Sequence, residues 1–195
     1  MISGEQSIFL NLQNAGGMDL WGVLFFFVAS PLHLLVALVS KENMFDLFTI
    51  LVMLKMMLAA GTAFLYFRRR FSRLGAGLTS VLASMYAFSG FCLMFYQNVI
   101  WLDTAYLFPL LLYGLDRLFQ EQKPGLYIGV LCAELFVNYY LCYMVVIFLL
   151  LYSGLYLTMC CSRGERRRGV VLFILSSAGA ALLTAVIRLP CLLQF

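Results

Sequence analysis

The sequence predicts an all-α fold, a polytopic bundle of transmembrane helices, and two observations lead to it. Of the 195 residues, 64% are hydrophobic and 11% are charged, whereas an ordinary soluble domain carries about 25% charged residues. Several apolar stretches also approach the roughly 20 residues that a helix needs to cross a hydrocarbon core about 30 Å thick. We therefore expect an integral membrane protein whose main partner is the lipid bilayer, and we expect no nucleic-acid partner.

The first 43 residues are predicted to form an external loop with short interfacial helices. They lack the basic start and compact apolar core of a signal peptide. The stretch Leu20–Val39 is long enough to span the membrane, but Ser30 and Pro31 interrupt it at its centre. Two short helices against the outer face explain this pattern as well as one membrane span does, so both interpretations stay open here.

Residues 44–195 are predicted to form one helical membrane domain. Its apolar segments are separated by polar or charged connections, and no Pro- or Gly-rich linker divides it. The predicted spans are Phe45–Phe67, Leu74–Phe95, Ala105–Phe119, Leu126–Val137, Leu141–Met159 and Val170–Leu189.

The basic residues predict the orientation of this bundle. They concentrate in alternate connections, which by the positive-inside rule face the cytoplasm. The segments Tyr96–Thr104 and Asn138–Tyr140 then face outside. The basic residues concerned are Arg68, Arg69, Arg70, Arg73, Arg117, Lys123, Arg163, Arg166, Arg167 and Arg168.

The run Leu126–Met159 should cross the membrane twice, because basic connections flank both of its ends. The first crossing, Leu126–Val137, rises only about 18 Å at 1.5 Å per residue. The turn at "NYY" should therefore lie below the outer surface, where irregular backbone is tolerated only if it is buried in protein or lines a wet cavity. A tight turn with interfacial aromatic residues is the alternative interpretation.

Two charged residues lie deep in predicted spans, Lys55 and Glu134. Unpaired charges are costly in a membrane, so we expect the two residues to lie at similar depth and to neutralise each other, as a buried charge pair, or to neutralise a buried polar site. Arg188, near the outer end of the last span, is expected either to extend to the interface or to contact a phosphate.

The outer polar segment "NVIWLDT" has two interpretations. In the first, Trp101 sits in the interfacial aromatic belt and Asp103 caps the next helix. In the second, Asp103 acts as a general base or ion-pair partner and the aromatic rings pack against a sugar or lipid headgroup. No metal site is predicted, because His33 is the single histidine and the cysteines lack paired spacing.

Several motifs together resemble the YfhO family of bacterial membrane proteins. They are "GGMDLWGVLFFFVASPLHLL", "LVMLKMMLAAGTAFLYF", "NVIWLDTAYLFPLLLYGLDRL" and "NYYLCYMVVIFLLLY", in that order. The resemblance implies a membrane-embedded glycosyltransferase of the GT-C type in the bacterial cell membrane. Such an enzyme would transfer sugar from a polyprenyl-phosphate donor to a cell-envelope glycopolymer acceptor, such as lipoteichoic acid; a divalent metal cofactor stays open.

The resemblance also assigns site residues. Gly16, Gly17 and Asp19 match an element of the first external loop, and the Ser30–Pro31–Leu32 break after it favours external helices over a span. Asp103 and Asp19 become the candidate catalytic acids. The candidate substrate- or lipid-binding residues are Asn98, Trp101, Asn138, Tyr139, Tyr140 and Arg188.

The chain departs from the family pattern in one respect. Family members begin with a further helix and an acidic motif and continue beyond the present end, so we expect the chain to be a fragment or a shortened relative. Whether it is an enzyme by itself is therefore open. The alternatives are a non-catalytic membrane scaffold or lipid-binding protein, and a transporter, which no inverted repeat supports.

Overall fold

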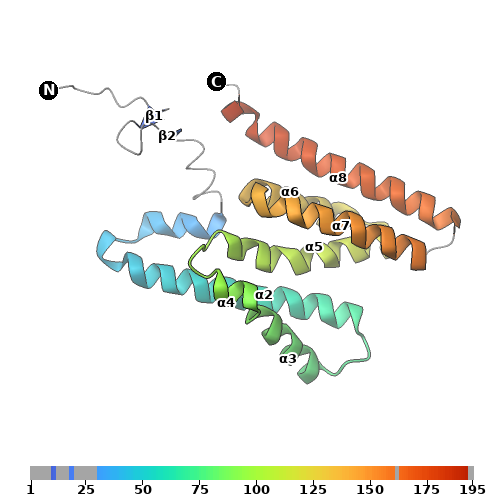
Figure 1. Cartoon of the computed structure of the whole chain (residues 1–195), viewed down its shortest axis with the longest axis horizontal. Coiled ribbons are helices and arrows are strands. Elements are labelled where there is room, and N and C mark those ends of the chain that lie inside the picture. Colours follow the sequence, from blue (N-terminus) through green and yellow to red (C-terminus); the bar gives the residue numbers. More distant parts are fainter. Residues whose placement is uncertain (1–9, 12–17, 20–29, 161–162, 193–195) are drawn as a thin grey trace.

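A computed structural model of the chain describes residues 10–11, 18–19, 30–160 and 163–192. It shows a helical bundle (Figure 1), which confirms the predicted all-α class; two strands of two residues each pair antiparallel before it. The elements are β1 (Leu10–Asn11), β2 (Met18–Asp19), the 3-10 helices η1 (Pro31–Leu38) and η2 (Lys41–Asn43), and the α-helices α2 (Met44–Arg70), α3 (Ala76–Ala87), α4 (Gly90–Met94), α5 (Trp101–Glu121), α6 (Gly125–Val137), α7 (Tyr139–Cys160) and α8 (Arg163–Leu192).

Within the described residues, four helical stretches are long and apolar enough to cross a membrane: Lys41–Arg70, Ala76–Met94, Tyr140–Cys160 and Gly164–Arg188. Two of the predicted spans do not meet this description. The predicted span Leu126–Val137 is the 13-residue helix α6, which rises only about 20 Å. The other, Ala105–Phe119, is part of α5, whose side chains are mostly buried inside the bundle.

Helix α5 is the centre of the bundle and packs against both α2 and α6. Its contact with α6 is close at Gly114, where an added Cβ would lie 3.0 Å from the backbone N and Cα of Tyr127. The leucines at 111, 115 and 118, spaced three and four residues apart along α5, are fully buried. Glycine at position 114 therefore permits a helix separation that a larger residue would increase.

A proline inside α5 is accommodated by a neighbouring helix. Pro109 has no N–H to donate to the carbonyl of Ala105, one turn earlier. The hydroxyl of Tyr86, from α3, donates to that oxygen at 2.8 Å. The carbonyl of Ala105, which has no helical donor because of Pro109, thus accepts a hydrogen bond from a residue outside α5.

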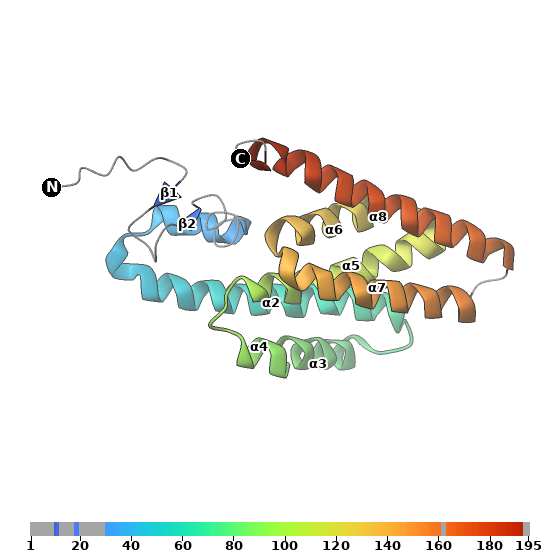
Figure 2. The ribbon, with the colours of Figure 1, turned by 45° about the horizontal axis from the view of Figure 1, so that its top comes forward.

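The ends of the bundle follow the alternation that the basic residues predict. Figures 1 and 2 show the C-terminal ends of α2, α5 and α7 at one end of the bundle and those of α4 and α6 toward the other. The basic residues of the sequence lie at the first of these ends: Arg68, Arg69 and Arg70 end α2, Lys123 follows α5, and Arg163, Arg166, Arg167 and Arg168 lie in the first two turns of α8. The predicted break at Ser30 is also where η1 begins, with Pro31 as its first residue; residues 20–29 lie outside the described residues.

Helix α8 packs against α6 through small side chains. Ser176, Ala180 and Thr184, spaced four residues apart, are all buried, and Thr184 donates to the sulfur of Cys132 at 3.2 Å. Small residues let the two backbones approach closely. The α6–α8 contact is therefore a small-residue interface.

Candidate functional site

The site is organised around a buried ion pair between α2 and α5. The Nζ of Lys55 lies 2.8 Å from Oδ1 of Asp103, and both side chains are fully buried. The same Nζ donates to the carbonyl oxygen of Val99 at 2.9 Å and lies 2.9 Å from Nε2 of His33. The ammonium of Lys55 therefore has one charged partner, which compensates its charge, and two neutral ones.

The tautomer of His33 depends on the protonation of Lys55. If Lys55 carries three protons, Nε2 of His33 must accept, which places the imidazole proton on Nδ1. His33 lies in η1, so the ion pair connects the segment before the bundle to its two central helices. The pair thereby positions both the imidazole and the backbone at Val99.

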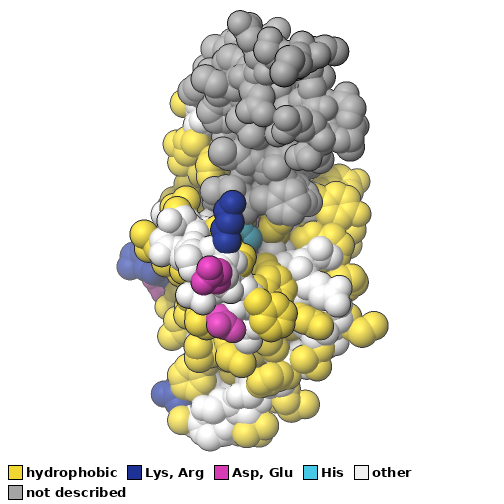
Figure 3. Space-filling view, turned by 90° about the vertical axis from the view of Figure 1, so that its left-hand side faces the viewer, with side chains coloured by type: hydrophobic (Ala, Val, Ile, Leu, Met, Phe, Trp, Pro, Cys, Tyr) yellow, Lys and Arg dark blue, Asp and Glu magenta, His cyan; other side chains and the backbone are white. Residues whose placement is uncertain are grey.

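A cavity of about 670 Å³ lies directly beside this pair. It is formed by η1, by the first part of α2 and by the irregular segment before α5. Its wall is mostly apolar. Among the lining residues, His33, Gln97, Asn98 and Trp101 have polar side-chain atoms, and the apolar ones include Leu47, Phe48, Leu51, Val99 and Ile100. Figure 3 views the molecule from this end, where charged side chains gather among hydrophobic ones.

The ion pair, and not the cavity, is recessed along α2, because the cavity lining includes Met44 at the start of that helix. Lys55 follows the first residue of α2, Met44, by 11 residues, which corresponds to about 16 Å along the helix axis. Its partner Asp103 is in the first turn of α5, so α5 begins deep beside α2. The irregular backbone before α5 at this depth lines a cavity, as expected for such backbone within a membrane protein.

The predicted direct pair between Lys55 and Glu134 is wrong. Glu134 is buried, but its Oε1 accepts a hydrogen bond from the hydroxyl of Thr104 at 2.6 Å, and Lys55 pairs with Asp103 instead. The physical reason is the position of α5 between α2 and α6. Asp103 and Thr104 are consecutive, and their side chains leave the helix about 100° apart. The first turn of α5 therefore provides a partner for Lys55 through Asp103 and a partner for Glu134 through Thr104.

The two polar segments predicted at the outer end meet in space. Nδ2 of Asn138 donates to the carbonyl of Ile100 at 3.4 Å, and its Oδ1 accepts from the backbone N–H of Leu141 at 3.2 Å. The rings of Trp101 and Tyr140 stack with their centroids 6.5 Å apart. The break between α6 and α7 is therefore joined to the start of α5.

Arg188 contacts the end of α6. Its Nη2 donates to the carbonyl oxygens of Leu135, at 3.1 Å, and Phe136, at 2.7 Å. A cation at a helix C-terminus satisfies carbonyls that have no helical donor and interacts favourably with the helix dipole. These contacts hold α8 to α6; the phosphate contact expected for Arg188 stays a prediction.

Other predicted site residues fall where the structure gives less detail. Asp19 ends β2, and its backbone pairs with Leu10. The side chains of Asp19 and Tyr139 and the whole of Gly16 and Gly17 lie outside the described residues. The roles expected for these residues therefore stay predictions.

Sequence reasoning used His33 only to exclude a histidine metal site and missed its contact with Lys55. The available signal was position: His33 follows the Ser30–Pro31 break by two residues. It also missed an ionic cluster at the opposite end, where Arg69 contacts Glu121 at 2.7 Å and Arg70 lies 3.9 Å from the buried Asp116. The hydrogen bond from Arg69 lowers the pKa of Glu121 below its ordinary value.

The sequence model described as "Bacterial membrane protein YfhO" matches residues 1–195. No curated protein and no solved structure shows a significant match. With membrane-length apolar helices and a family match along its whole length, the chain belongs to the YfhO family of bacterial membrane proteins.

Proposed function

We propose that this protein is a membrane-embedded glycosyltransferase of the GT-C type and that its described residues form the donor side of the active site. The donor is a polyprenyl-phosphate sugar, and the acceptor is a hydroxyl of a cell-envelope glycopolymer such as teichoic acid. The cavity beside Lys55 and Asp103 holds the sugar and phosphate of the donor on the outer side of the membrane. The basic connections then face the cytoplasm, in accordance with the positive-inside rule.

The observation that carries the proposal is a fully buried ion pair beside a largely apolar cavity that has a few polar residues in its wall. Burying two charges is costly, and well-packed apolar residues of similar size often serve stability as well or better. Here the pair fixes His33 and the carbonyl of Val99, and both residues line the cavity. The cost of burying Lys55 and Asp103 is consistent with a functional site in which His33 and Val99 must keep fixed positions in the cavity wall.

The geometry favours a positioning role for Asp103 over a role as the general base. Its carboxylate is fully buried and engaged by Lys55, whereas a base must reach the proton that it removes. Asp19, in the segment before the bundle, stays a candidate for that base. Asn98 and Trp101 are suited to contact the sugar, because an amide offers both donor and acceptor groups and an indole offers an apolar face.

In the proposed reaction an external carboxylate takes the proton of the acceptor hydroxyl, whose oxygen attacks the anomeric carbon. The bond from that carbon to the phosphate oxygen breaks, and its electron pair leaves with polyprenyl phosphate. Positive charge or hydrogen-bond donors near this phosphate stabilise the leaving group. The donor groups available on the described cavity wall are the amides of Gln97 and Asn98 and the indole of Trp101.

Analysis of the envelope polymer tests this function. A strain lacking the protein is complemented with the wild type, with Asn98→Leu or Trp101→Leu, or with the control Phe119→Leu, which lies in the last part of α5. We expect the wild type and the control to restore the sugar on the polymer. Each of the two cavity variants should leave the polymer with little or no sugar. Unchanged polymer in the deletion strain itself would contradict the function.

A non-catalytic lipid-binding protein is the second candidate, and the apolar lining of the cavity wall by Leu47, Phe48 and Leu51 favours it. The two candidates differ in one result. A lipid-binding protein would bind the polyprenyl-phosphate sugar in vesicles and leave it intact when acceptor is added, whereas a transferase would release polyprenyl phosphate.

A further inference from the structure

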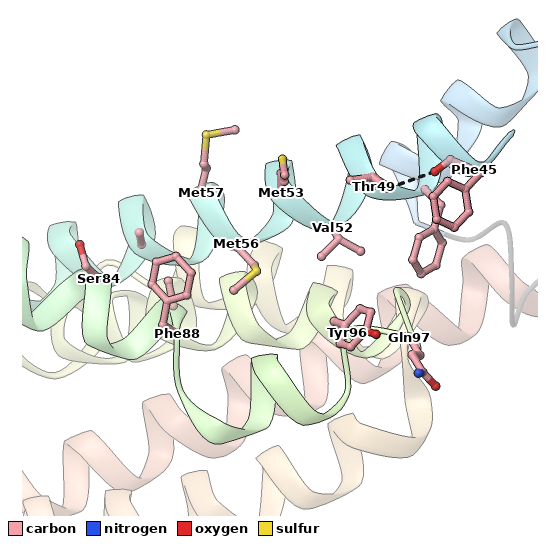
Figure 4. A pocket seen from close by; sticks show the side chains of 13 residues that line it. Phe45, Thr49, Val52, Met53, Met56, Met57, Ser84, Phe88, Tyr96 and Gln97 are labelled. Atoms are coloured by element: carbon pink, nitrogen blue, oxygen red, sulfur yellow. Dashed lines mark hydrogen bonds between the residues drawn. The ribbon is translucent and has the colours of Figure 1, made fainter. Parts of the chain in front are cut away.

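We propose that a second groove on the bundle holds the hydrocarbon chain of the polyprenyl-phosphate donor, an inference that rests on the proposed function. This tail groove has a volume of about 800 Å³ and lies between α2 and the α3–α4 segment (Figure 4). Ligand pockets commonly measure roughly 300–1,000 Å³. The lining residues are Phe45, Phe48, Thr49, Val52, Met53, Met56, Met57, Ala60, Ser84, Ala87, Phe88, Tyr96 and Gln97.

The tail groove has the chemistry of a hydrocarbon site. Its lining is mostly aromatic, aliphatic and methionine side chains, and methionine adapts its shape to irregular apolar partners. Met53, Met57 and Phe88 are each at least 60% exposed, so the groove is open at its side. Because α2 and the α3–α4 segment are both apolar enough to span a membrane, this opening faces hydrocarbon, and a lipid chain can enter without leaving the bilayer.

The length of the tail groove matches an extended chain. Its lining on α2 runs from Phe45 to Ala60, and 15 residues of helix correspond to about 22 Å. That is most of a hydrocarbon core roughly 30 Å thick. A groove of this length along a membrane helix suits a long chain that lies parallel to the lipids better than a compact ligand.

One end of the tail groove is polar and continues into the cavity beside the ion pair. Figure 4 shows Tyr96 and Gln97 at the same end as Phe45, with Phe88 and Ser84 toward the other end. Gln97 and Phe48 line both the tail groove and the cavity with His33. The two hollows therefore adjoin, in the order that an amphiphile requires: a polar head at Gln97 and an apolar chain along α2. A packed protein helix would not require this polar end, which is why we assign a lipid.

Photo-crosslinking tests the occupant directly. The protein, as its host produces it, carries p-benzoylphenylalanine at Met57, inside the tail groove, or at Ile50, an exposed residue of the same helix outside it. Vesicles contain radiolabelled polyprenyl phosphate or radiolabelled phosphatidylglycerol. We expect labelling by polyprenyl phosphate at Met57 to saturate and to be displaced by unlabelled polyprenyl phosphate but not by excess phosphatidylglycerol. Labelling at Ile50 should not saturate with either lipid.

A steric variant with a matched control adds a second readout. Ser84 is exposed and lines the tail groove, whereas the neighbouring Met85 is exposed but does not line it. Ser84→Trp should weaken saturable binding of polyprenyl phosphate about tenfold or more, the change that a loss of 1.4 kcal/mol produces. Met85→Trp should leave binding unchanged.

Three results would overturn the inference. They are equal, non-saturable labelling at Met57 and Ile50, displacement by phosphatidylglycerol as effective as by polyprenyl phosphate, and a protein–protein crosslink at Met57 in place of a lipid crosslink. Failure of the proposed function is a different result. In that case the crosslinker at position 57 is still labelled saturably by polyprenyl phosphate, but the protein transfers no sugar.

Discussion

Lys55 and Asp103 form an ion pair with 2.8 Å between Nζ and Oδ1, and neither side chain is accessible. The two residues lie 48 positions apart in the sequence and join α2 to the first turn of α5. Because Lys55 also contacts Val99 and His33, one side chain connects three segments around the cavity.

Removing only one partner of this pair should be strongly destabilising. Lys55→Met leaves Asp103 buried without its cation, which typically costs about 3–5 kcal/mol. The double variant Lys55→Met/Asp103→Leu removes both charges and should recover most of that loss. Thermal unfolding of the purified variants in detergent measures the coupling energy.

The matched control combines Lys55→Met with Glu134→Leu. Glu134 is hydrogen-bonded to Thr104 and not to Lys55, so this combination should be closer to additive. Strong coupling of Lys55 to Glu134, together with none to Asp103, would contradict the arrangement described.

His33 should be replaceable only by a residue that accepts a hydrogen bond. His33→Phe leaves one N–H of the buried Lys55 without its acceptor, and such a loss costs about 1–3 kcal/mol. His33→Gln supplies an amide oxygen and should retain more stability. Unfolding of the two variants under identical conditions decides this, and equal stability would show that the contact to Lys55 carries no energy.

Tyr86→Phe should destabilise the protein by about 1–3 kcal/mol, because the carbonyl of Ala105 loses its donor inside the bundle. The cause can be isolated with Pro109→Ala, which restores an N–H within α5. In the Pro109→Ala background, Tyr86→Phe should cost clearly less. An equal cost in both backgrounds would assign the effect to packing of the ring.

Gly114→Ala should destabilise the contact between α5 and α6. The new Cβ would meet the backbone of Tyr127 at 3.0 Å, and overpacking commonly costs about 1–3 kcal/mol. Gly129→Ala, in α6, is the control, because no atom lies within 4 Å of its added Cβ. Alanine there should be neutral or stabilising by up to about 1 kcal/mol. Similar unfolding temperatures for the two variants would contradict the close approach.

The sequence predicted features that depend on local chemistry. The break at Ser30–Pro31, the break at Asn138 and the long apolar helices follow from proline geometry, polar residues and segment length. The shortness of α6 followed from counting residues. These properties need no knowledge of which helices are neighbours.

The partner of Lys55 could not be predicted in the same way. Asp103 and Glu134 are both acidic residues that could pair with Lys55. Which of them does so depends on how α5 is rotated about its axis between α2 and α6. The role of Tyr86 was hidden for the same reason, since only the packed structure places its hydroxyl at the Ala105 carbonyl opposite Pro109. The involvement of His33 likewise depends on how η1 packs on the bundle.

The most direct test of the central claim is sugar transfer by the purified protein in vesicles, comparing the wild type with Lys55→Met/Asp103→Leu. The double variant should stay folded, because both buried charges are removed together. We predict that the wild type transfers sugar from the polyprenyl-phosphate donor and that the folded double variant loses most of this activity. A folded double variant with the wild-type transfer rate would contradict the claim that the pair positions the site.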